Sequence, residues 1–280
     1  MTPVFLVGPT ASGKTAVAHA LGRPVISADS MQVYRGMDIG TAKDKAAQLV
    51  DICDITEAFD VKRFVELATP LLPGAVVCGG TGLYIRALRQ GIFDGPVRDT
   101  ALRTRLEALP AAALFAELER LDPKAAATID RHNPRRLVRA LEVFHTTGKS
   151  IRDFQTQTSS GGLIFGLHRD RQDLIQRIEQ RIEEQMRAGW LDEVRQLMAK
   201  GIEQNPVAMQ AAGYRELVAH LRGKLSLPEA VALIKIRTRQ LAKRQMTWFR
   251  REPGLQWLTV AVDEAPAATA AKILEKLPSH

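Results

Sequence analysis

Short apolar runs alternate along the chain with longer stretches whose apolar residues recur at helical spacing. The apolar runs occupy residues 4–7, 25–28, 75–78, 163–167 and 256–260. Strands that alternate with helices in this way are typical of a parallel sheet with helices on its faces. The pattern therefore predicts an α/β fold built on a parallel sheet.

The pattern changes to helices alone between about residues 98 and 160. Asp99 is placed to cap one helix, and Asp122 and Asn133 each precede a proline, which is favoured at the first helical position. Gly148 is placed to end the helix that begins after Asn133. We therefore expect an all-helical insert at residues 98–160.

The chain returns to the α/β pattern after this insert. Leu174, Ile178 and Ile182 lie at the spacing of one helix face, which indicates an amphipathic helix packed on the core. We therefore expect a discontinuous core made of residues 1–97 and 161–280.

The first apolar run leads into GPTASGKT, which has the spacing of a phosphate-binding loop between a strand and a helix. In such a loop, glycines let backbone N–H groups turn toward an anion, a lysine adds positive charge, and a hydroxyl suits Mg²⁺. We expect a P-loop NTPase-like core that binds a di- or triphosphate, with Mg²⁺ as cofactor and Thr15 as its ligand. The predicted phosphate-binding residues are Gly8, Pro9, Thr10, Ala11, Ser12, Gly13, Lys14 and Thr15.

Two other predicted strands end in residues that suit chemistry. Asp29 follows the run 25–28, at the edge where α/β sheets collect their sites, and it suits a Mg²⁺ ligand, a general base or a helix cap. The run 75–78 is followed by GGTG, which contains Thr81, where an ordinary P-loop hydrolase has an acidic residue. Glycines there indicate the close approach of a bulky group. The missing carboxylate argues against hydrolysis.

The balance of charges favours a polyanionic partner. Lysine and arginine number 39 against 31 acidic residues, which gives a formal net charge of +8. Cys53 and Cys78 are too few for a disulfide framework, and no cysteine or histidine cluster has zinc spacing. With no secretion signal and no run of ~18 apolar residues, we expect a cytoplasmic protein with no membrane partner.

Two predicted helices concentrate positive charge. Arg135, Arg136 and Arg139 project to the side opposite the apolar residues of their helix, and residues 235–251 hold seven basic residues and no acidic one. Both stretches suit a polyanionic partner. A solvated basic face with scattered ion pairs is the alternative for the second stretch.

Together these segments resemble the successive motifs of the bacterial tRNA dimethylallyltransferases. The motifs are GPTASGKT, DSMQVYRGMDIGTAK, GGTGLYIRAL, DPKAAATIDRHNPRRLVRALEVFHTTGK, QAAGYREL and TRQLAKRQMTWFRR, in the family's order over residues 4–251. The resemblance implies transfer of a dimethylallyl group from dimethylallyl diphosphate to N6 of the adenosine 3′ to the anticodon of tRNA. It also implies Mg²⁺, no zinc, and a loop that holds diphosphate instead of ATP.

The resemblance assigns roles by position. Asp29 matches the residue that deprotonates the amine, Thr81 matches a hydroxyl that contacts the nucleotide, and Arg215 matches a second clamp on the diphosphate. The residues it implies for tRNA binding are Asp29, Ser30, Met31, Gln32, Thr81, Arg103, Arg135, Arg136 and Arg139. Arg135 stands where the family usually has Gln, and Asp44 where it has Pro, which affects local geometry and removes no reacting group.

The chemistry is consistent with these roles. An adenine amine is a poor nucleophile, so a carboxylate that removes its proton during attack is useful, and the leaving diphosphate needs nearby positive charge. A small-molecule or nucleoside kinase using ATP would share the loop and Asp29, but the sequence identifies neither a base pocket nor a phosphoryl acceptor. A non-catalytic RNA-binding protein would leave Asp29 and Thr81 without a role. We therefore expect a transferase, acting as a monomer.

Overall fold

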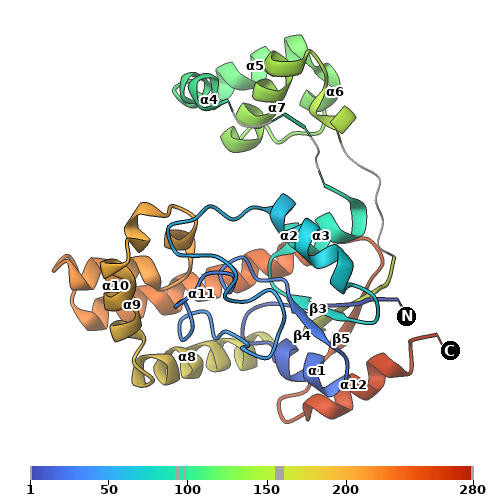
Figure 1. Ribbon diagram of the computed structural model, residues 1–280, viewed down its shortest axis with the longest axis vertical. Coiled ribbons are helices and arrows are strands. Elements are labelled where there is room, and N and C mark those ends of the chain that lie inside the picture. Colours follow the sequence, from blue (N-terminus) through green and yellow to red (C-terminus); the bar gives the residue numbers. More distant parts are fainter. Residues whose placement is uncertain (1, 93–94, 97–98, 155–160, 279–280) are drawn as a thin grey trace. The chain divides into compact units, whose positions relative to one another are not determined.

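A computed structural model of the protein describes residues 2–92, 95–96, 99–154 and 161–278 (Figure 1). Its five strands form a parallel sheet in the order β2-β3-β1-β4-β5. The strands are β1 (Val4–Val7), β2 (Val25–Ser27), β3 (Val76–Gly79), β4 (Leu163–His168) and β5 (Leu255–Thr259). Each predicted apolar run is a strand, so the parallel α/β sheet is confirmed.

Helices cover both faces of this sheet. The helices of the core are α1 (Lys14–Ala20), α2 (Val61–Ala68), α3 (Gly82–Gln90), α8 (Arg171–Arg187), α9 (Trp190–Ala199), α10 (Tyr214–Leu221), α11 (Leu227–Phe249) and α12 (Pro266–Leu274), with 3₁₀ turns at Thr69–Leu71, Ile202–Gln204 and Ala208–Gln210. In the part of the chain that is described, no helix combines the length and the hydropathy that crossing a bilayer requires.

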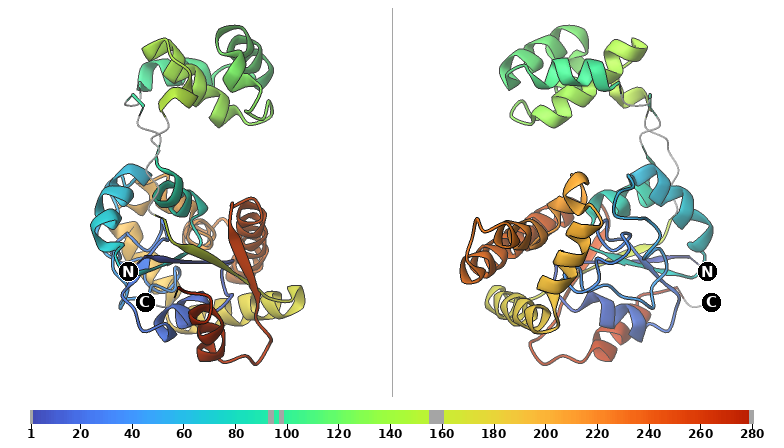
Figure 2. Two further views of the ribbon diagram at one scale, coloured as in Figure 1. Left: turned by 90° about the vertical axis from the view of Figure 1, so that its right-hand side faces the viewer. Right: turned by 60° about the vertical axis from the view of Figure 1, so that its left-hand side comes forward.

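Alternation along the strands divides the core in two. Phe5 and Val7 of β1 belong to a large apolar cluster that includes side chains of α2, α3 and α8 to α11, whereas Val4 and Leu6 belong to a smaller one with α1 and α12. Figure 2 shows α1 and α12 together on one side of the sheet. Because both faces are covered, the sheet offers its reactive groups at the strand ends.

A second compact unit comprises Gln90–Thr158, while Met1–Arg89 and Ser159–His280 form the first. The described residues of the second unit contain helices and no strand. They are α4 (Thr100–Glu107), α5 (Ala111–Leu121), α6 (Pro123–Ala126), α7 (Pro134–Thr147) and a 3₁₀ turn at Ile151–Phe154. The predicted limits of the insert, residues 98 and 160, lie outside the described residues.

The helices of this unit begin and end where their capping residues predict. Asp99, Asp122 and Asn133 each accept a backbone N–H from the first turn of the helix that follows. Gly148 ends α7 with a left-handed φ of 68°.

One buried carboxylate joins α4 to α7. Glu142 has no exposed surface, accepts the backbone N–H of Asp99 (2.9 Å), and pairs with Arg139 (2.8 Å) and Arg103 (3.6 Å). Two guanidinium groups and one N–H therefore offset the cost of burying its charge.

Glu142→Ala is expected to lower the free energy of unfolding of the second unit by about 3 kcal/mol, because it removes the buried carboxylate that pairs with Arg139 and accepts the N–H of Asp99, whereas Arg103 keeps its ion pair with Glu107. Denaturant titration followed by circular dichroism measures the change, with Glu119→Ala, an exposed glutamate on α5, as the matched control. Equal losses in the two variants would contradict a structural role for Glu142.

Candidate active site

Parallel pairing brings the loops after β1, β2 and β3 to one edge of the sheet. Val7 pairs with Gly79 and Ser27 with Cys78, so the three strands end side by side. A cavity of about 310 Å³ lies beyond their ends. It brings together many of the predicted site residues, namely Thr10, Ala11, Lys14, Thr15, Asp29, Ser30, Met31, Gln32 and Thr81.

Two arginines hold the phosphate-binding loop from outside the cavity. Ala11 and Gly13 have left-handed φ angles of 62° and 89°, which turn successive peptide groups to opposite sides. The carbonyl of Ala11 accepts a hydrogen bond from Arg177 Nε (3.0 Å), and that of Ser12 accepts one from Arg169 Nε (2.9 Å). Both arginines line a separate cavity. The two carbonyls are therefore engaged away from the place where an anion would lie.

Two cations line the main cavity within electrostatic reach of Asp29. Desolvation by burial lowers the pKa of Lys14, and it likewise lowers the pKa of Arg181 on α8, while Asp29 acts in the opposite direction on both. Sequence reasoning missed Arg181 because its helix was interpreted as plain core packing. Its position between Ile178 and Ile182, on the buried face, was the available signal.

Hydrogen bonds of Asp29 and Thr81 hold the loops that follow β2 and β3. Asp29 Oδ1 accepts the backbone N–H of Met31 (2.9 Å), so Asp29 does cap a turn. Thr81 Oγ1 accepts the backbone N–H of Ser30 (3.0 Å) and donates to Ser30 Oγ (3.3 Å). Among the described residues, none donates a hydrogen bond to Asp29 Oδ2. That oxygen is therefore available to a substrate.

Gln32 lines the cavity, but its amide is used by the protein. Its Oε1 accepts the hydroxyl of Ser27 (2.8 Å), and its Nε2 donates to the carbonyls of Thr41 (3.2 Å) and Ala42 (3.3 Å). Its contacts are those of a residue that holds the wall of the cavity in place.

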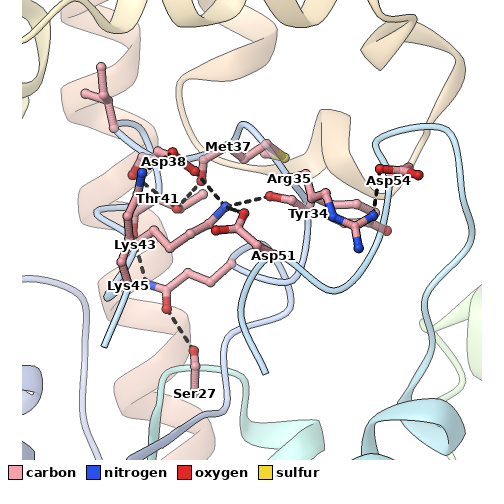
Figure 3. Close-up of polar contacts among 12 residues, drawn as sticks. Ser27, Tyr34, Arg35, Met37, Asp38, Thr41, Lys43, Lys45, Asp51 and Asp54 are labelled. Atoms are coloured by element: carbon pink, nitrogen blue, oxygen red, sulfur yellow. Dashed lines mark hydrogen bonds and ion pairs between the residues drawn. The ribbon is translucent and has the colours of Figure 1, made fainter. Parts of the chain in front are cut away.

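Lys43 fixes the long loop between β2 and α2 (Figure 3). Its side chain is fully buried, and Nζ donates to the carbonyl of Tyr34 (2.7 Å), to Asp38 Oδ1 (2.7 Å) and to Asp51 Oδ1 (2.5 Å). Two carboxylates thus accompany the buried ammonium. The loop therefore presents Gly40 to the cavity in a defined position.

Trp190 forms a rigid apolar wall. A Cβ at Gly40 would lie 2.1 Å from the indole Nε1, and a Cβ at Gly213 would lie 2.1 Å from its Cη2, so the ring fits only between two glycines. Its side chain is buried, and with Ile182 and Leu241 it gives the cavity an apolar side.

The glycines after β3 make room for α11. A Cβ at Gly82 would lie 2.2 Å from Trp248 Cδ1, and a Cβ at Gly80 would lie 2.2 Å from Gln245 Nε2. The bulky group expected at this loop is therefore part of the protein itself.

Arg215, the predicted second clamp on the diphosphate, lies in a different place. It lines a neighbouring cavity of about 100 Å³, which shares Ala211 and Ala212 with the main one. Its side chain is 55% exposed and its Nε lies 3.5 Å from Glu216 Oε1. Arg181 is the arginine that lines the main cavity.

The four predicted arginines of the second unit divide into two pairs. Arg103 and Arg139 are engaged with Glu142, and Arg139 also donates to the carbonyl of Pro96. Arg135 and Arg136 are exposed at the start of α7 and form no ion pair among the described residues. Of the four arginines, Arg135 and Arg136 are therefore the two that the protein leaves exposed.

The basic stretch 235–251 is partly neutralised. Lys235, Arg237 and Arg239 pair with Glu183, Glu216 and Glu179 at 2.8, 2.6 and 2.6 Å. The helix ends at Phe249, and Lys243, Arg244, Arg250 and Arg251 are exposed. The alternative of scattered ion pairs thus describes its first half.

Among the described residues, no group of three or more histidine, cysteine, aspartate or glutamate side chains is placed to hold a metal. Thr15 and Asp29 both line the cavity and are oxygen ligands. A cation with so few protein ligands would take the others from phosphate and water, as Mg²⁺ does. The residues therefore fit Mg²⁺ held mainly through a diphosphate.

Cys78 also lines this cavity, and burial raises the pKa of its thiol to about 12. A thiol that keeps its proton is a poor nucleophile. Cys78 is therefore not suited to act as a nucleophile in this cavity.

Comparison with known proteins matches residues 32–252 to the IPP transferase family. The tRNA dimethylallyltransferase of Symbiobacterium thermophilum is 46% identical, over 94% of this chain and 90% of that protein. The tRNA dimethylallyltransferase 2 of Syntrophus aciditrophicus is 43% identical, over 97% and 96%.

Solved structures give the same result. The tRNA isopentenylpyrophosphate transferase of Bacillus halodurans matches with a TM-score of 0.70 at 38% identity, over 98% of this chain and 96% of that one. A eukaryotic dimethylallyltransferase acting on tRNA matches with a TM-score of 0.81 at 23% identity, over 99% and 81%, which supports the fold. The predicted P-loop NTPase-like core agrees with these neighbours.

Lys14→Met is expected to weaken the binding of inorganic diphosphate by about 30-fold, because it removes one buried charge-stabilising donor.

Since burial lowers the pKa of Lys14, Lys14→Met should also unfold at higher denaturant concentration than the wild type. This gain should be largest where the lysine is charged and should vanish as the pH rises through the pKa values of both states. Calorimetry and denaturant titration measure the two effects, with Lys200→Met, an exposed lysine, as control. If Lys14→Met binds diphosphate with wild-type affinity, the phosphate-binding loop is not part of the diphosphate site.

Proposed function

Because the chain belongs to the IPP transferase family, we propose that it is a tRNA dimethylallyltransferase. It transfers a dimethylallyl group from dimethylallyl diphosphate to N6 of the adenosine 3′ to the anticodon, and it releases diphosphate. The observation that carries this proposal is one cavity lined by Lys14, Arg181 and Asp29 and bounded by an apolar wall. The transfer requires positive charge for the leaving group, an apolar surface for the prenyl group and a carboxylate for the amine.

The diphosphate is held by the phosphate-binding loop and by Arg181. Negative charge grows on the leaving oxygen as its bond to C1 breaks, and Lys14 and Arg181 stabilise this charge where it develops. Arg215 lines the neighbouring cavity, and from there it contacts the RNA backbone or the departing diphosphate. Bound Mg²⁺, held by Thr15 and the diphosphate, would add further charge stabilisation.

Asp29 receives the proton of the amine. The N6–C1 bond forms, the C1–O bond breaks, and the proton passes to the carboxylate, whose Oδ2 has no donor among the described residues. Thr81 and Ser30 hold the loops beside the incoming nucleotide. The base must leave its stack to reach a cavity of this kind.

Water is kept from C1 by the apolar side of the cavity. Trp190, Ile182 and Leu241 surround the place that a prenyl group would occupy next to Arg181. Exclusion of water protects an allylic diphosphate from hydrolysis and strengthens the interactions with its charges.

The second unit binds the tRNA through the exposed start of α7, where Arg135 and Arg136 face solvent. The kinase alternative is not supported, because the matching relatives are prenyltransferases. A non-catalytic role leaves Asp29, Lys14 and Arg181 in one cavity without a purpose. A monomeric state and a cytoplasmic location remain predictions.

Incubation of tRNA with the protein, Mg²⁺ and dimethylallyl diphosphate is expected to yield N6-dimethylallyladenosine and diphosphate in a one-to-one ratio, detected by nucleoside mass spectrometry. Asp29→Asn should lower the turnover by roughly 10² or more, since it removes the general base. It should change tRNA affinity only a few-fold, since asparagine has nearly the same shape as aspartate. Formation of ADP and a phosphorylated product from ATP would instead identify a kinase. Near-normal turnover of Asp29→Asn would exclude Asp29 as the base.

The dependence of tRNA affinity on salt should distinguish the two arginine pairs. Replacing Arg135 and Arg136 together with Gln should reduce the slope of log affinity against log salt by about 2, one unit for each lost phosphate contact. Arg139→Gln, on the same helix but engaged with Glu142, should leave the slope unchanged. A slope that responds to Arg139 alone would reverse the assignment.

A further inference from the structure

Gln245 connects the two loops that the transfer has to align. Its Oε1 accepts the backbone N–H of Thr10 (2.8 Å), and its Nε2 donates to the carbonyl of Gly80 (3.2 Å). Thr10 belongs to the phosphate-binding loop, and Gly80 precedes Thr81 in the loop after β3. A single carboxamide that lines the cavity therefore spans its diphosphate side and its nucleotide side.

The position of Gln245 is tightly constrained by its surroundings. The carboxamide packs directly on the backbone of Gly80, where a Cβ would lie 2.2 Å from Gln245 Nε2. Trp248 lies on the same helix and is wedged against Gly82, where a Cβ would lie 2.2 Å from its ring. Since α11 packs against this loop at two places, the carboxamide of Gln245 lies within hydrogen-bond distance of both loops.

We propose that Gln245 is a positioning residue that sets the distance between C1 of the allylic diphosphate and the amine that attacks it. This inference rests on the proposed function. Displacement requires the reacting atoms to lie ~3–3.5 Å apart, and a displacement of ~1 Å can cost about 10²-fold in rate. A side chain that bonds to both substrate-holding loops fixes this separation without touching either reacting atom.

Misalignment has its own product. When the amine is out of reach, water attacks C1: the C1–O bond to the diphosphate breaks, an O–C1 bond forms, and a proton leaves to solvent. The products are dimethylallyl alcohol and diphosphate. The ratio of alcohol to prenylated tRNA therefore reports alignment, whereas a loss of folded protein lowers both products equally.

The test uses Gln245→Met, which keeps the length of the side chain and removes both hydrogen bonds. We expect the rate of tRNA prenylation to fall about 10- to 100-fold and the alcohol-to-prenyl ratio to rise at least about 10-fold. Affinities for tRNA and for inorganic diphosphate should stay within about 3-fold of the wild type. Gln196→Met, an exposed glutamine on α9, is the matched control and should behave as the wild type.

Gln245→Glu provides a second, independent variant. It keeps an acceptor for the Thr10 N–H but turns a carboxylate oxygen toward the carbonyl of Gly80, which repels it, so its alcohol-to-prenyl ratio should also rise above that of the wild type. An alcohol-to-prenyl ratio that is unchanged in both variants, whatever their rates of prenylation, would overturn the proposal. A loss of tRNA affinity that matches the loss of kcat/KM would also overturn it, because Gln245 would then act as an RNA contact. Failure of the proposed function is seen separately, as wild-type protein that forms no prenylated tRNA.

Discussion

Parallel pairing of β1 with β3 is the constraint on which the rest of the molecule depends. Val7 lies opposite Gly79, so the loops that follow these strands leave the sheet at the same level. The loop after β2 joins them because Gly79 has no side chain, and a Cβ there would lie 2.2 Å from the carbonyl oxygen of Ala28. Three loops therefore meet at one edge, and helices α8 and α11 cover the space between them.

The electrostatics of the cavity suit a substrate that carries its own negative charge. Burial disfavours the charges of Lys14 and Arg181, as the lowered pKa of each shows, and Asp29 is the acidic side chain that opposes this effect on both. A bound diphosphate would supply the missing counter-charge. In the second unit, by contrast, the buried charge is already paired, because Glu142 has two guanidinium partners. Arg181 thus differs from Arg103 and Arg139, for which the protein itself provides a carboxylate.

Local patterns predicted the local structure. The five strands, the caps at Asp99 and Asn133, and the phosphate-binding loop follow from apolar runs, capping residues and motif spacing. The helix α12 was not predicted, although Pro266 at its first position and its alanines are local helix signals; Ala270 and Ile273 then pack it on the core.

The candidate site was predicted less completely, because several of its contacts join distant parts of the chain. The bond between Thr10 and Gln245 spans 235 positions, and the slot for Trp190 needs glycines from two separate segments. Arg181 carries no motif of its own. For Arg139, the helix face was predicted correctly, but the pairing with Glu142 was not, since it depends on how α4 packs against α7.

If one cavity aligns the two substrates for direct displacement, the configuration at C1 must change in a defined way. Dimethylallyl diphosphate made chiral at C1 with a single deuterium shows whether it does. The configuration at C1 in the prenylated adenosine is then read by degradation to a chiral fragment of known configuration. We expect inversion, because the amine attacks opposite the diphosphate. Retention, or a racemic product, would contradict it by requiring a covalent intermediate or a free allylic cation.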